Sequence, residues 1–317
     1  MFCILPFYAI GGEYILRKIR KFFQYDTIGM LFVFPAFLYM LVFVGYPIVR
    51  NIILSLQDVT MANLVHGMKK FVGFQNYIEL FKDSVFRTSL INTLVFTVRC
   101  LVMQFIIGFA LAIFFNKRFA ISKPLRGILL VPWMIPITVT ALIFKLLFAT
   151  DIGVLNYILK SLHLVSEKIE WLTTPQTAMF ALICANVWIG IPFNMILIST
   201  GLTTIPKDLY ESASIDGATG LQAFFKITLP LLTPTIFFNL VMQMINGFLA
   251  FTQCYIITQG KPMNSTLFYT VYMYQQSFEY YNTGYGAALA WVMLLIVGLI
   301  TAVLFATKRF WVYEEGL

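Results

Sequence analysis

No charged residue interrupts the stretch Tyr285-Gly-Ala-Ala-Leu-Ala-Trp-Val-Met-Leu-Leu-Ile-Val-Gly-Leu-Ile-Thr-Ala-Val-Leu-Phe-Ala-Thr307. An apolar helix of about 20 residues is long enough to cross the hydrocarbon core of a bilayer. Five further stretches are apolar over a similar length, at residues 28–49, 89–115, 127–149, 178–200 and 232–257. The sequence therefore predicts an all-α, polytopic membrane protein with six transmembrane helices.

The composition indicates that lipid is the main solvent. Of the 317 residues, 60% are hydrophobic and 11% are charged, whereas soluble domains carry about 25% charged residues. No small-residue cleavage site follows a basic start, so we expect no removable signal peptide. The four cysteines lack the paired spacing of a metal site or a disulfide framework, and we interpret them as apolar packing residues.

The Lys and Arg residues predict the orientation of the helices. Compact basic clusters occur at residues 17–21 and 117–126, and the cytoplasmic flanks of membrane helices are enriched in these residue types. We therefore expect both termini in the cytoplasm, with an N-terminal segment 1–27, a six-helix domain 28–310 and a tail 311–317. The net charge of +8 is then explained by basic residues that set the orientation of the helices, and no nucleic-acid-binding patch is indicated.

The acidic residues and histidines all fall outside the predicted spans. A proton-coupled carrier usually keeps Asp, Glu or His at membrane depth as a relay. A secondary carrier is therefore disfavoured, and we expect the driving force for uphill transport to come from elsewhere.

Uncharged amides are the main polar groups inside the predicted spans. They are Gln104, Asn186, Asn194, Asn239, Gln243, Asn246 and Gln253. Amides can exchange hydrogen bonds with a neutral, hydroxyl-rich solute, but they also join helices to one another in lipid. Both interpretations stay open for any single amide.

The fifth predicted span is the strongest candidate for a solute pathway. Gln243 and Asn246 are three residues apart and Gln253 follows seven residues later, so a helix would align the three amides in one stripe. Phe248 and Phe251 would share a neighbouring face, where apolar helix packing explains them equally well. The amide stripe also disfavours a purely structural or assembly protein.

Arg99 is unusual because it lies inside the second predicted span, where no carboxylate is available as a partner. Such a residue must face water, backbone carbonyls, amides or a solute. We predict that Arg99 faces a cavity, and a structural role as a cap for exposed carbonyls is the alternative. Lys145 lies near the outer end of its span and is expected to snorkel.

A polar loop, residues 201–230, separates the fourth and fifth predicted spans. Pro206 can open a helix, Asp208 and Glu211 suit its first turns, and Asp216-Gly217 can end it. Within this helix, residues at spacings i, i+3, i+4 and i+7 would form a small-residue ridge: Tyr210, Ala213, Ser214 and Gly217. Such a helix could dock on a partner protein or pack on its own bundle.

The same loop carries a family resemblance. Glu211-Ser212-Ala213, Gly217 and Ile227-x-Leu229-Pro230 resemble the EAA loop of ATP-binding-cassette (ABC) importer permeases, whose pattern is Glu-Ala-Ala, three residues, Gly, nine residues and Ile-x-Leu-Pro. Ser212 departs from the pattern by one small residue. Further stretches are similar to the carbohydrate branch, which includes maltose, multiple-sugar and glycerol-phosphate permeases; they begin at residues 74, 92, 264 and 274. Lys261 departs from a Gly-Gly-Pro that such permeases usually carry.

The resemblance implies that this loop is a coupling helix held in a cleft of a separate ATPase subunit. The residues it assigns to that contact are Tyr210, Glu211, Ala213, Asp216 and Gly217. It also implies that the stretch 248–258 contributes to a sugar site, with Tyr272 and Tyr274 in a second such stretch. Arg99, Gln243, Asn246, Phe248, Phe251 and Gln253 complete the predicted pathway.

The resemblance further implies an importer of several chains in the bacterial plasma membrane. The expected partners are a second, similar permease, two ATPase subunits and an extracytoplasmic solute-binding protein. The chain has no G-x-x-x-x-G-K-[ST] phosphate-binding loop, so we expect it to be no enzyme and to bind no cofactor, with ATP and Mg²⁺ used by the partners. The expected cargo is a sugar or oligosaccharide; a polyol, glycerol-phosphate or polyamine is the alternative.

Overall fold

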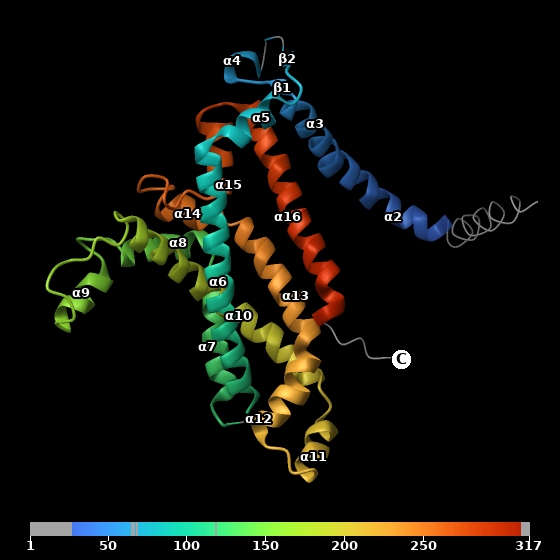
Figure 1. Cartoon of the computed structure of the whole chain (residues 1–317), viewed down its shortest axis with the longest axis vertical. Helices are drawn as coiled ribbons and strands as arrows, with labels where there is room; N and C mark the ends of the chain where they lie inside the picture. Colours follow the sequence, from blue (N-terminus) through green and yellow to red (C-terminus); the bar gives the residue numbers. More distant parts are fainter. Residues whose placement is uncertain (1–26, 65–66, 68, 118, 312–317) are drawn as a thin grey trace, which may run out of the picture. The chain divides into compact units, whose positions relative to one another are not determined.

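The computed structural model describes residues 27–64, 67, 69–117 and 119–311 (Figure 1). The predicted terminal segments 1–27 and 311–317 lie outside this range except for their innermost residues. Contacts divide the chain into two units, Met1–Leu54 and Ser55–Leu317. Each unit is considered by itself.

The smaller unit contains the first predicted span. Helix α2 (Thr27–Met40) continues through the π-helical turn η1 (Leu41–Gly45) into α3 (Tyr46–Ser55). Residues Phe32–Ser55 are long and apolar enough to cross a membrane, and no side chain in their most apolar window is buried within the structure. This candidate span covers most of the predicted span 28–49 and extends to residue 55.

The larger unit begins with a small polar subdomain. Strands β1 (Gln57–Asp58) and β2 (Lys70–Phe71) pair antiparallel, and the short helices α4 (Met61–Leu64) and α5 (Gln75–Lys82) flank them. The buried side chain of Asn76 donates to the carbonyls of Ser55 and Gln57, at 2.9 and 3.1 Å. These bonds fix α5 against the start of the unit.

Three further predicted spans are single long helices: α6 (Ser84–Asn116), α10 (Pro175–Thr204) and α16 (Thr283–Trp311). Asp83 caps α6 by accepting a hydrogen bond from the Val85 backbone at 2.8 Å. Helices α6 and α10 pack closely, because Gly108 leaves no Cβ where one would lie 2.5 Å from that of Asn194. Hydropathy therefore located these helices correctly, although each extends past its predicted ends.

The third predicted span, 127–149, is not one continuous helix. Helices α7 (Ser122–Met134) and α8 (Ile137–Leu147) meet at a bend of 92°. Ile135 has an extended ψ of 133°, as expected of a residue that precedes a proline, and Pro136 has no N–H to continue the helix. Counting α7 and α8 as one broken span, the described residues contain six candidate spans.

The fifth predicted span is also interrupted. It falls within the apolar segment Gly220–Ile257, but α13 (Leu229–Phe248) ends before the short helix α14 (Thr252–Ile257) begins. The Ala250 carbonyl accepts a hydrogen bond from the Thr270 hydroxyl at 2.5 Å. A side chain distant in sequence therefore takes the place of the backbone N–H that would bond this carbonyl in a continuous helix. Helix α14 then packs against α8.

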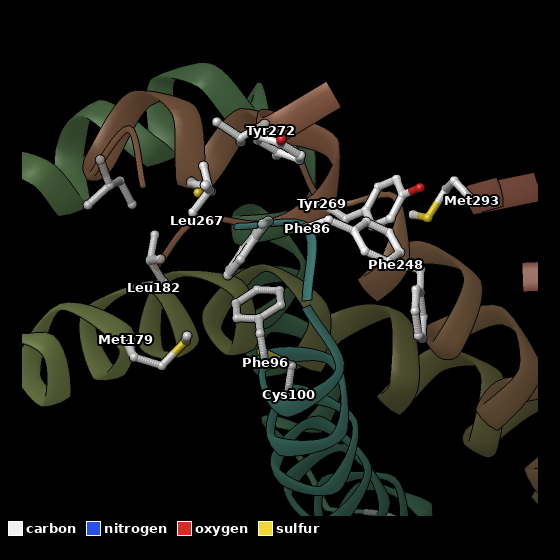
Figure 2. Close-up of a cluster of buried hydrophobic side chains, with 14 of the residues drawn as sticks. Phe86, Phe96, Cys100, Met179, Leu182, Phe248, Leu267, Tyr269, Tyr272 and Met293 are labelled. Atoms are coloured by element: carbon white, nitrogen blue, oxygen red, sulfur yellow. The ribbon is translucent and has the colours of Figure 1, made fainter. Parts of the chain in front are cut away.

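The remaining elements lie at the ends of the long helices. Helix α9 (Val154–Ser161) follows α8, whereas α11 (Lys207–Ile215), α12 (Gly220–Ala223) and the π-turn η2 (Phe224–Thr228) connect α10 to α13. Helix α15 (Tyr269–Tyr274) and the π-turn η3 (Gln275–Glu279) precede α16. Figure 2 shows part of the main hydrophobic core, where rings such as Phe96 and Tyr269 gather.

Candidate functional site

A cavity of about 450 Å³ lies where both helix interruptions meet the long helices. Residues of α6, α7, α8, α10, α13 and α14 line it, together with the non-helical residues 249–251. Its polar lining residues are Thr97, Gln104, Asn186, Asn194, Gln243, Asn246, Thr252 and Gln253. Four residues of the predicted pathway are among the lining residues: Gln243, Asn246, Phe251 and Gln253.

One chain of amides crosses the cavity wall from α6 to α14. Gln104 Nε2 donates to Asn186 Oδ1 at 2.6 Å and to the Asn186 carbonyl at 3.0 Å. Asn186 Nδ2 in turn donates to Gln253 Oε1 at 2.8 Å. Three helices are therefore joined by side chains that share one cavity.

A second amide chain joins α10 to α13. Gln243 Nε2 donates to Asn194 Oδ1 at 2.5 Å and to Asn239 Oδ1 at 2.8 Å. Asn194 Nδ2 donates to the Gly190 carbonyl at 2.9 Å within its own helix. Two residues of the predicted stripe, Gln243 and Gln253, therefore belong to different networks, and the interruption at residues 249–251 separates Gln253 from the helix of Gln243.

Glycines allow these amides to approach neighbouring helices. A Cβ on Gly190 would overlap the Gln104 side-chain amide, and a Cβ on Gly247 would lie 2.5 Å from Thr97 Cγ2. Small residues serve this purpose in membrane bundles, because lipid supplies no hydrophobic force between helices and close packing must do so.

Three polar atoms on residues of the cavity wall are buried without a hydrogen-bond partner among the described residues: Thr97 Oγ1, Gln243 Oε1 and Gln253 Nε2. One is a hydroxyl, one accepts and one donates. All three atoms are closed to solvent, so a solute in the cavity does not touch them in this conformation.

Aromatic rings border the cavity beside α14. Phe251 stacks on Tyr255 with ring centres 5.0 Å apart, and Tyr274 lies 5.2 Å from Phe251. Tyr274 also contacts Phe278 at 5.1 Å. Tyr274 therefore reaches the cavity wall through Phe251.

The structure places two predicted pathway residues in the core instead. Phe248 is 2% exposed and Tyr272 is 5% exposed, and both belong to the main hydrophobic cluster (Figure 2). Phe248 therefore does not line the cavity, because α13 turns this ring into the core just before it ends, and its role in a pathway stays a prediction. Tyr272 donates its hydroxyl to the Asp83 carboxylate, as does Tyr285 at 2.9 Å.

The Asp83 carboxylate ties the start of α6 to α15 and α16. Partial burial would raise its pKa, but the hydrogen bonds from Tyr272, the Val85 backbone and Tyr285 outweigh burial and hold that pKa below its usual value. Asp83 is therefore a charged structural link, at the end of α6 opposite the loop 201–230.

Arg99 does not line the amide cavity. Its exposed side chain lies in a shallow groove formed by α6 and α10, with Val98, Val102, Met103, Phe180 and Ile183. The next residue, Cys100, lines the cavity, and successive helical residues point about 100° apart. Water access to Arg99 stays a prediction.

The loop 201–230 has the helix that its sequence predicts. Helix α11 follows Pro206, has Asp208 in its first turn and is capped by Asp216. Gly217 has a φ of +77°, and its N–H bonds the Ser214 carbonyl at 3.1 Å while that of Ala218 bonds Ala213 at 2.9 Å. These two bonds form a Schellman motif, in which the residue after the helix adopts the left-handed αL conformation that favours glycine. Gly217 therefore lies beyond the helix and not on its ridge.

The two faces of α11 differ. Tyr210 packs on the second hydrophobic cluster, and its hydroxyl bonds that of Thr228 at 2.8 Å. Glu211 is exposed, and Ala213 is half-buried. Large apolar side chains nearby are also exposed, notably Ile215 at 87% and Leu221 at 73%. One face thus holds the helix to its own bundle and the other is free for a partner.

Sequence reasoning did not assign Gln104, Asn186 and Asn194 to the site, because they lie on other spans than Gln243. The glycines at 108 and 190 are the signal that could have found them, since each marks a close approach of α6 and α10.

Comparisons with known proteins cover most of the chain. The family model described as "Binding-protein-dependent transport system inner membrane component" matches residues 104–310. The probable ABC transporter permease protein YesP of Bacillus subtilis is 36% identical over 312 residues, which cover 96% of this chain and 98% of YesP. The trehalose/maltose transport system permease protein MalF of Thermococcus litoralis is 33% identical, with 89% of this chain and 94% of that protein covered.

Two further matches are similar in extent. The sulfoquinovosyl glycerol transport system permease protein SmoG of Agrobacterium fabrum is 33% identical, with 87% of this chain and 88% of SmoG covered. A chain from the crystal structure of a bacterial ABC transporter that imports alginate matches with a TM-score of 0.77 and 23% identity, covering 92% of this chain and 98% of the other. The structural match shows that the fold is shared.

Proposed function

The chain belongs to the family of binding-protein-dependent transport system inner membrane components, and we propose that this importer permease passes a sugar or oligosaccharide through the amide-lined cavity. The observation that carries the proposal is the lining of the cavity, whose polar side chains are uncharged amides and hydroxyls. Solute hydroxyl groups both donate and accept hydrogen bonds, as such side chains do. The relatives named for trehalose/maltose and sulfoquinovosyl glycerol transport support a carbohydrate cargo.

In this proposal Gln243, Asn246 and Gln253 exchange hydrogen bonds with the solute, and Phe251, held by Tyr274, covers an apolar sugar face. Phe248 and Tyr272 support the wall from the core. Arg99 belongs to the transport pathway only if a second permease completes a wider passage along the groove between α6 and α10.

The exposed surface of α11 and α12 is the proposed contact with an ATPase. Tyr210 anchors α11 to the bundle, so Glu211, Ala213, Asp216 and Gly217 are held in fixed positions beside the exposed Ile215. We expect two ATPase subunits to use ATP and Mg²⁺, because this chain has no phosphate-binding loop of its own. A second permease and an extracytoplasmic solute-binding protein complete the proposed importer, with both termini of this chain in the cytoplasm.

Uptake by the reconstituted importer tests the cargo. Proteoliposomes would be offered labelled disaccharide, polyol, glycerol-phosphate and polyamine in parallel. We expect sugar uptake, with a roughly two- to tenfold loss for each alanine variant of Gln243, Asn246 or Gln253, since one hydrogen bond to a neutral group contributes about 0.5–1.5 kcal/mol. Unchanged uptake and selectivity in all three assembled variants would reject the cavity as the pathway.

The coupling contact is tested at Gly217. Replacement by Leu forces a β-carbon into the αL conformation, although open space surrounds the position. We expect Gly217→Leu to abolish sugar-stimulated ATP hydrolysis with normal membrane insertion. Gly217→Asn is the matched control, because Asn tolerates αL, and it should retain most coupling. Full coupling in Gly217→Leu would remove the assignment.

A further inference from the structure

Residues 148–174 form a separate feature between α8 and α10. They leave α8 at its last turn and return to α10 at its first residue, at the end of α10 opposite the loop 201–230. Helices α8 and α9 extend to one side of α6 in Figure 1. Both flanking helices belong to candidate membrane spans, so the segment starts and ends at the membrane.

This segment has a built framework around Asn156, which is buried. Its Nδ2 donates to the carbonyls of Thr150 and Ile169, at 3.0 and 2.9 Å. Its Oδ1 accepts from the Ile169 N–H and from Trp171 Nε1, each at 3.1 Å. Trp171 packs in turn on Phe148 with ring centres 5.5 Å apart. The position of α9 is therefore fixed by hydrogen bonds and ring packing.

The outer surface of this framework carries large apolar side chains together with charged ones such as Glu167 and Glu170. Its exposed large apolar side chains are Ile152, Val154, Tyr157, Ile158, Leu162 and Leu164, and three of them are more than 65% exposed. A patch of this kind in contact with water would be unfavourable. The inner face of α9 holds Asn156, so the apolar side chains are not simply the core of the segment.

Two observations indicate that lipid covers this patch. The apolar surface continues along α8, where Leu142, Ile143 and Leu146 are exposed on the second half of a broken candidate span. Within the patch, a groove of about 500 Å³ is lined by Ile152, Val154 and Tyr157 together with Asp151, Lys160 and Lys168, and Lys168 Nζ lies 2.9 Å from Asp151 Oδ1. Charges of both signs next to an apolar face match the zwitterionic headgroups above acyl chains.

We propose that residues 148–174 rest on the bilayer surface, with their apolar side chains among the upper acyl chains and Lys160 at headgroup level. The exposed Tyr157 belongs to the residue types that gather at this interface. A short amphipathic helix lies in the plane of the membrane in this way, and its lysines extend toward the headgroups.

Fluorescence quenching in nanodiscs tests the proposal on the full chain with its partner subunits. Ile152→Cys and Leu162→Cys would each carry a bimane label, with Glu167→Cys as the matched control on the same segment. The parent chain treated with the same label supplies the blank. We expect brominated phosphatidylcholine to quench the two apolar positions at least twofold and to leave Glu167→Cys unchanged, while iodide does the reverse. A label at Lys160→Cys should respond most to a lipid with a nitroxide headgroup.

Protection of the two apolar positions from both lipid bromine and iodide would overturn the proposal, because protein would then cover the patch, whether a partner subunit or the smaller unit of this chain. Strong iodide quenching without lipid quenching would overturn it as well, since the segment would then lie in water.

Discussion

Removing Asn186 should expose how much the amide chain contributes to the fold. In Asn186→Leu, Gln253 Oε1 loses the donor that lies 2.8 Å away, and Gln253 Nε2 has no partner among the described residues. The Gln253 side chain is 2% exposed, so water cannot replace the lost bond. The whole amide is then buried without partners.

The expected magnitude follows from two scales. An orphaned buried polar group costs about 1–3 kcal/mol, whereas hydrogen bonds between membrane helices average about 0.6 kcal/mol and reach about 1.7 kcal/mol in double-mutant cycles. We therefore expect Asn186→Leu to lower the free energy of unfolding by about 1–3 kcal/mol. Asn186 and Gln253 should couple by about 0.6–1.7 kcal/mol, because the double variant with Gln253→Leu leaves no orphan.

Titration of the purified chain with sodium dodecyl sulfate in mixed micelles, followed by circular dichroism, measures these energies. The matched control is the cycle of Asn246→Leu with Gln253→Leu, since Asn246 is exposed on the same cavity. A coupling between Asn186 and Gln253 no larger than in this control cycle would refute the hydrogen-bonded chain.

Two further predictions concern packing and pH. Gly247→Ala should lower the unfolding temperature because its Cβ would lie 2.5 Å from Thr97 Cγ2, and such overpacking costs about 1–3 kcal/mol. Gly298→Ala is the control, because its Cβ meets open space, and it should leave the unfolding temperature unchanged. Equal effects of the two variants would contradict the close approach of Gly247 and Thr97. The lowered pKa of Asp83 means that its stabilisation is present above the unfolded value of about 3.9 and is lost as the pH falls through the lower folded value. The parent should therefore exceed Asp83→Asn in unfolding temperature at pH 5 and approach it toward pH 3, and a constant difference would argue against this link.

The long helices could be predicted from the sequence because a single property, the length of an apolar run, determines them. The ends of α11 were also predictable, since Pro206 and Gly217 act locally through their own backbone preferences. Pro136 was a sequence signal for the bend at residue 135, but a hydropathy average over about 20 residues does not register a single proline. The interruption at residues 249–251 contains no proline, and its carbonyl partner Thr270 comes from a later element.

The site was harder to predict than the helices because it depends on how helices face one another. Asn186 and Gln253 meet only once α10 and α14 are packed, and no spacing within one helix encodes that contact. Arg99 and Cys100 differ by one position, yet one lies in an outer groove and the other lines the cavity. Hydropathy locates both residues in the same span, but it does not determine which side of the helix faces the cavity.

The bend between α7 and α8 also bears on the order of events in biogenesis. Helix α7 has 13 residues and α8 has 11, so neither reaches the roughly 20 residues that a membrane span requires. The insertion machinery must therefore accept residues 122–147 as one segment. The main packing partner of α8 is α14, which is synthesised more than a hundred residues later. The nascent chain thus passes through a stage in which this segment is inserted but α8 still lacks its main neighbour, and the bent arrangement is completed only after α14 has left the ribosome.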